Sequence, residues 1–99
     1  MVLEIADIRV APDQQAAFEE AIQRAIKTVA SQARGARNAK VSRCIETPGR
    51  YVLQIEWDTL EDHTMGFRQG PLFAQWRAII GPYFASPPLV EHFELVTQG

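Results

Sequence analysis

A chain of 99 residues is long enough for one domain, 1–99, with one core, and short enough that self-association would add useful burial. Its 46% hydrophobic and 22% charged residues are typical of a globular protein, and a formal net charge of −2 with scattered Lys and Arg argues against a nucleic-acid-binding surface. The apolar stretches fall short of the roughly 20 residues that cross a bilayer. No secretory leader is recognisable, and the single Cys44 cannot form an internal disulfide. We therefore expect a cytoplasmic protein.

The first half of the chain predicts a strand, a helix and a hairpin. Residues 2–10 are rich in aliphatic side chains, and the Pro12–Asp13 pair that follows favours a turn. Residues 13–33 carry an apolar stripe at helical spacing, and Gly35 is a plausible C-cap. Residues 38–46 and 50–58 read as two strands joined by a turn that contains Pro48 and Gly49.

The second half predicts two short helices and a last strand. Leu60, His63 and Phe67 recur at steps of three and four, so on a helix they share one face, which we expect to point inward. A second helix follows, with apolar residues at Leu72, Phe73, Trp76, Ile79 and Ile80. After the Gly- and Pro-rich segment 81–88, residues 89–96 form the last predicted strand.

The predicted order is therefore β-α-β-β-α-β, the ferredoxin-like arrangement of an α+β protein, in which an antiparallel sheet carries its helices on one face. In the third strand one face is wholly apolar and should lie under the helices. The final strand keeps apolar residues on both faces, which favours a partner sheet on the uncovered side. We predict a homodimer formed through the sheet faces.

Two aromatic-rich helices and one inward-facing His63 predict a largely apolar pocket with a single titratable group near neutral pH. A small aromatic ligand is the expected occupant. A metal site is not expected, because His63 and His92 belong to no recognised ligand spacing. The sequence also has no GxGxxG fingerprint for a dinucleotide, and the strand RYVLQIEW lacks the exposed aromatics with which RNA-binding sheets stack bases.

Three segments, IEWDTLEDHTMGF, GPLFAQWRAIIGPYF and VEHFELV, occur in this order and give the chain a resemblance to the antibiotic biosynthesis monooxygenase family over nearly its full length. The resemblance implies a dimeric α+β barrel with a pocket between helices and sheet in each subunit. Several members oxidise aromatic polyketides or quinols with dioxygen and no prosthetic group, so we expect no cofactor.

The heme-degrading branch of this fold uses an Asn on the first strand, a Trp in the helical segment and a ligating His on the next helix. The corresponding positions hold Asp7, Gly66 or Phe67, and Trp76, so heme cleavage by that route is not expected.

The leading hypothesis is a cofactor-independent monooxygenase that binds an aromatic ring in an apolar slot and removes a hydroxyl proton before reaction with dioxygen. His63 is the first candidate for the base and His92 the second. The candidate substrate-binding residues are Trp57, Phe67, Phe73, Trp76 and Tyr83. The alternative is a non-catalytic dimeric barrel that binds small molecules or serves a stress response, in which His63 only bonds a backbone carbonyl and the aromatic residues are core packing.

Overall fold

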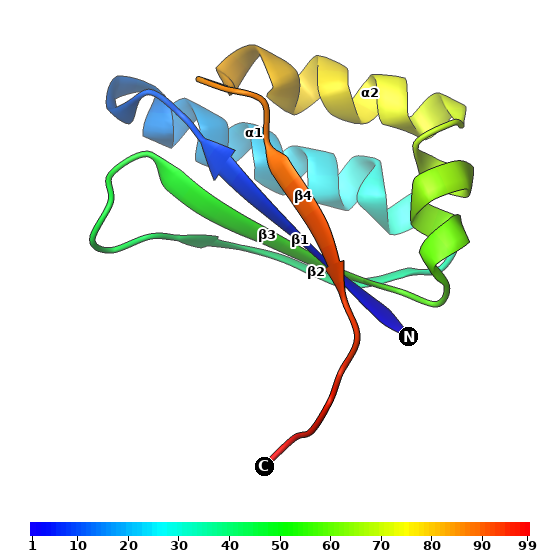
Figure 1. Cartoon of the computed structure of the whole chain (residues 1–99). Helices are drawn as coiled ribbons and strands as arrows, with labels where there is room; N and C mark the ends of the chain where they lie inside the picture. Colours follow the sequence, from blue (N-terminus) through cyan, green and yellow to red (C-terminus); the bar gives the residue numbers. More distant parts are fainter.

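The computed structural model describes residues 1–99 and contains four strands and two α-helices (Figure 1). The strands are β1 (Val2–Arg9), β2 (Ala36–Arg43), β3 (Arg50–Trp57) and β4 (Leu89–Phe93), and the α-helices are α1 (Gln15–Thr28) and α2 (Pro71–Ile80). A short π-helix, Asp62–Phe67, lies between β3 and α2, and 3₁₀ turns occupy Pro12–Gln14, Ala30–Gln32 and Gly81–Tyr83.

All four strands form one antiparallel sheet in the order β2-β3-β1-β4. Both α-helices lie on the same face of this sheet (Figure 1). The predicted ferredoxin-like α+β fold is thereby confirmed.

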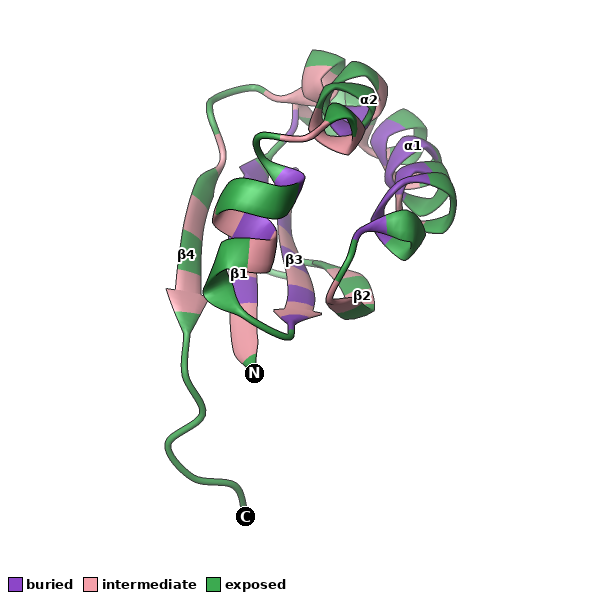
Figure 2. Cartoon of the chain, turned by 90° about the vertical axis from the view of Figure 1, so that its right-hand side faces the viewer, coloured by how far each residue is buried: buried purple, intermediate pink, exposed green.

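The core lies between the sheet and the helices because two central strands alternate strictly. On β3, four alternate side chains from Tyr51 to Trp57 are buried, while the residues between them are half-buried. On β1 the inward positions are Glu4, Ala6 and Ile8. From α1 the core receives Phe18, Ala21, Ile22 and Ala25. Figure 2 shows these buried stripes facing the space between the two layers. Glu4 is the one polar side chain that β1 sends into this core.

The opposite face of the sheet has no helix over it and remains partly apolar. Leu89 and Phe93 of β4 are 61% and 45% exposed. Phe93 pairs with Leu3 across the β1–β4 ladder, and Ile5 lies two residues further along the same face of β1.

Several predicted boundaries were wrong. The last strand ends at Phe93 and not at 96, because Phe93 already pairs with Leu3 and β1 offers almost no further backbone. The first helix ends at Thr28, because the chain tightens into the 3₁₀ turn Ala30–Gln32 just after it. Gly35, with φ of +81°, serves the turn into β2 and not a C-cap.

Two other expectations were wrong for related reasons. Leu60 is 40% exposed although His63 and Phe67 are buried, because it precedes the π-helix, whose wider turn breaks the three- and four-residue spacing. The second strand spans Ala36–Arg43 and not 38–46, and a bulge between Arg37 and Lys40, with Asn38 at φ +52°, interrupts its pairing.

Gly49 gives a direct test of this packing. Its φ is +82°, and a Cβ there would lie 2.1 Å from the carbonyl oxygen of Val10, whose own N–H donates to the Gly49 carbonyl. Gly49→Ala should therefore lower the free energy of unfolding by about 2 kcal/mol or more in urea titrations. Gly81→Ala is the matched control, because its Cβ would meet open space at an ordinary helical φ. Equal stabilities of the two variants would contradict the structure.

Candidate functional site

The centre of the candidate site is a carboxyl group buried on the first strand. Glu4 faces the helices at an inward position of β1, between the sheet and the π-helix. The indole Nε1–H of Trp57 donates a hydrogen bond of 2.9 Å to its Oε1. This bond supplies part of the stabilisation that water would otherwise give a carboxyl group. The second oxygen, Oε2, makes no hydrogen bond within the chain.

His63 lies against this carboxyl group. Its ring stacks on Trp57, with 4.8 Å between centroids and 12° between planes, so the indole fixes both Glu4 and the imidazole. The Nε2 atom is 3.4 Å from Glu4 Oε1, and Nδ1 is 2.7 Å from Nε2 of His92. Both ring nitrogens of His63 therefore face a protein partner.

The sheet register brings the third group to the same place. Glu4 of β1 and His92 of β4 are directly paired, so their side chains share the helix-facing side of the sheet. His92 is half-buried, whereas the other two groups are buried. We refer to Glu4, His63 and His92 as the carboxyl–imidazole cluster.

The surroundings of the cluster shift all three pKa values. Burial raises the pKa of Glu4, although the Trp57 hydrogen bond and the charge of Arg68 oppose the rise. Burial, aided by the charges of Arg68 and His92, lowers the pKa of His63 to about 4. Burial and Arg68 also lower the pKa of His92. At neutral pH the two imidazoles are therefore uncharged, and in the 2.7 Å contact one ring nitrogen donates its hydrogen to the other.

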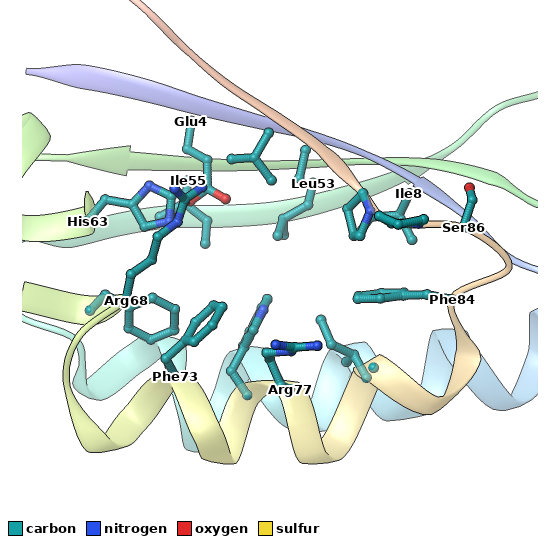
Figure 3. Close-up of a pocket in the computed structure, with 18 of the residues that line it drawn as sticks. Glu4, Ile8, Leu53, Ile55, His63, Arg68, Phe73, Arg77, Phe84 and Ser86 are labelled. Carbon is teal, nitrogen blue, oxygen red and sulfur yellow. The ribbon is translucent and has the colours of Figure 1, made fainter. Parts of the chain in front are cut away.

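Beside the cluster lies a cavity of about 560 Å³, within the range of small-molecule sites. Its sheet side includes Ile8, Leu53 and Ile55, and its helix side includes Phe73, Trp76 and Ile80. In Figure 3, Glu4 and His63 lie at one end of the cavity, and Phe84 and Ser86 lie at the other. The cavity is thus an apolar slot with a buried acid at one end.

The structure distributes the residues predicted from the sequence between the cavity and the core behind it. His63, Phe67, Phe73 and Trp76 line the cavity. Trp57 is fully buried behind Glu4, and Tyr83 packs toward Phe18, with 6.2 Å between ring centroids, so neither is part of the wall. His92 reaches the site only through its contact with His63.

Comparison with known proteins places the chain in a family. The sequence model of a family described as antibiotic biosynthesis monooxygenase matches residues 1–79. The chain belongs to this family. It is similar to the uncharacterised protein YczJ of Bacillus subtilis strain 168, with 34% identity over 94 residues that cover 95% of this chain and 98% of YczJ.

Solved structures agree with the family assignment. A crystal structure from Bordetella bronchiseptica, named for the same family, is 38% identical, covers 97% of each chain and superposes with a TM-score of 0.91. Rv0793 from Mycobacterium tuberculosis is 20% identical, with coverage of 98% of this chain and 96% of that chain and a TM-score of 0.77, and it supports the fold alone.

Three charged residues that line the cavity were not predicted from the sequence: Glu4, Arg68 and Arg77. Glu4 had a usable signal, because it is the one charged residue on the face of β1 that otherwise holds Ala6 and Ile8. The arginines had none, since arginine is usually solvated on helices and loops. The structure contains no group of three or more His, Cys, Asp or Glu side chains arranged to hold a metal ion, and none of its helices has the length and hydropathy to span a membrane.

The lowered pKa of His63 predicts how stability depends on pH. The unfolded chain binds a proton on this residue near pH 6.5, whereas the folded chain binds it only near pH 4, so stability falls as the pH drops between these values. His63 alone should contribute up to about 3 kcal/mol to this loss. The raised pKa of Glu4 has the opposite sign and offsets part of it.

Urea unfolding of the wild type and of His63→Asn at pH 7, 5.5 and 4.5 tests this assignment. The variant should be less stable at pH 7 but should lose less stability on acidification. The same loss in both proteins would show that His63 is not held neutral by the fold.

Proposed function

We propose that this protein is a cofactor-independent monooxygenase that oxidises a small hydroquinone-type aromatic compound with dioxygen. The observation that supports this proposal most strongly is the buried Glu4 carboxyl group, which has one oxygen free at the end of an apolar cavity. Dioxygen reacts slowly with most closed-shell organic molecules, so the substrate must be converted to an electron-rich anion. A buried base beside an aromatic slot is suited to that task.

Glu4 is a better candidate for the base than His63. Nδ1 of His63 contacts His92 at 2.7 Å, and Nε2 lies 3.4 Å from Glu4 Oε1. The lowered pKa of His63, about 4, also makes it a weaker base than an ordinary imidazole. Glu4 retains Oε2, and its raised pKa makes it a stronger base than an ordinary carboxylate. His63 then acts as a positioning residue for Glu4, and His92, which is half-buried, extends the cluster toward solvent.

In the proposed reaction Glu4 accepts the proton of a substrate hydroxyl group. The resulting anion transfers electron density to dioxygen, and a carbon–oxygen bond forms at the adjacent ring carbon. Glu4 returns its proton to the outer peroxide oxygen. The oxygen–oxygen bond then breaks and releases hydroxide, as the ring carbon loses its hydrogen as a proton. One oxygen atom remains on the product, a hydroxyquinone, and the other leaves as water, so hydroquinone and dioxygen give hydroxyquinone and water. The charge of Arg68, close enough to act on all three groups of the cluster, would stabilise the anion.

Oxygen uptake with a panel of hydroquinones tests this proposal. Protein treated with a chelator and shown to be free of flavin should consume oxygen faster than the uncatalysed background. Glu4→Gln, which preserves shape but cannot accept a proton, should lower the excess rate by about 100-fold or more. Glu20→Gln, on the exposed side of α1, is the matched control and should retain full activity.

His63→Ala and His92→Ala separate catalysis from the alternative of a non-catalytic binding barrel. In an enzyme both substitutions should reduce oxygen uptake while ligand binding persists. Failure of every hydroquinone to react above background, with binding intact, would favour the binding protein.

We further propose that two subunits associate through the uncovered sheet face to form the dimeric α+β barrel. The support is the partly apolar strip of Leu3, Ile5, Leu89 and Phe93 on that face. Light scattering at micromolar concentration should give the mass of a dimer, and Phe93→Asp should shift it toward the monomer. Ile45→Asp, in the exposed β2–β3 connection, should leave the mass unchanged. A monomeric wild type would refute the barrel.

A further inference from the structure

A second charged group lines the cavity away from the carboxyl–imidazole cluster. Arg77 of α2 forms part of the wall, and Figure 3 shows its guanidinium group between Phe73 and Phe84. Its guanidinium carbon lies 5.9 Å from the centre of the Phe73 ring, so the side chain lies over an aromatic face. This contact holds the guanidinium group of Arg77 against the cavity wall.

Arg77 forms no ion pair within the chain. The arginines at positions 9, 37, 43 and 50 each lie within 4 Å of a carboxylate, but Arg77 does not. The one carboxyl group that lines the cavity is Glu4, which is bonded to Trp57 and lies nearer to the charge of Arg68. A guanidinium group with several unused donors beside an apolar slot is suited to a carboxylate.

We propose that the cavity binds an aromatic acid, with its ring system between the sheet and α2 and its carboxylate on Arg77. This inference deepens the proposed function, on which its catalytic meaning rests, by naming the substrate class as a hydroquinone that carries a separate acidic group. The hydroxyl group would then face Glu4 at one end of the cavity, while the acid is held on Arg77 further along the helix side. Binding energy from the acid would fix the register of the ring against the base.

The experiment compares 2-naphthoate with 2-naphthamide, which has nearly the same shape but no charge, by titration calorimetry on the full chain. Naphthoate should bind about tenfold more tightly or better, as charge-assisted hydrogen bonds to one guanidinium group allow. Arg77→Gln should reduce this preference to about twofold or less. Arg24→Gln, which removes the same charge from the exposed side of α1, should leave it intact.

Three results would overturn the inference: equal binding of the two probes, no binding of either, or a preference that survives in Arg77→Gln. If the preference for naphthoate survives in Arg77→Gln but is lost in Arg68→Gln, the carboxylate binds at the carboxyl–imidazole cluster and not on Arg77. A role of Arg77 limited to the C-terminal turn of α2, where cations favour the helix dipole, predicts lower stability with the preference unchanged.

This experiment is independent of oxidation, because neither probe has an oxidisable hydroxyl group. Preference for naphthoate without any hydroquinone oxidation would refute the proposed function and leave the anion site in place. Oxidation of neutral hydroquinones without preference for naphthoate would refute the anion site and leave the proposed function in place.

Discussion

The geometry of the site is set by the interactions that stabilise the buried carboxyl group of Glu4. An ionised carboxylate in an apolar core is strongly destabilising unless hydrogen-bond donors or cations replace its hydration. Trp57 supplies one donor, and Arg68 supplies a positive charge from outside. The same indole stacks on His63, so the group that stabilises the acid also orients the imidazole. Trp57, a core residue at the end of β3, thereby holds in place two of the groups proposed to act on the substrate.

The fold was largely predictable from the sequence because its central strands alternate in a simple way. Tyr51, Leu53, Ile55 and Trp57 all face one side, and such a pattern requires a covering layer of helices. The element boundaries were less predictable, since they depend on tertiary pairing. The end of β4, for example, is set by the N-terminal end of β1, its partner far away in the sequence.

The site was only partly predictable. Spacing identified His63 and Phe67 as inward-facing, but the π-helix that turns Leu60 outward has no simple sequence signal. The proximity of Glu4 to His92 follows from the strand register, and the 2.7 Å contact of the two imidazoles follows from the placement of the π-helix over β4. A lone glutamate on an apolar strand face was the one available clue to the buried acid.

We propose that Glu4, and not an imidazole, receives the substrate hydroxyl group. A crystal structure with 2-naphthol, a phenol that resists oxidation by dioxygen, tests this role of Glu4 most directly. We expect the naphthol ring in the cavity between Ile55 and α2, with its oxygen within hydrogen-bonding distance of Glu4 Oε2. A naphthol bound in the cavity with its oxygen on a nitrogen of His63, or turned away from both groups, would contradict it.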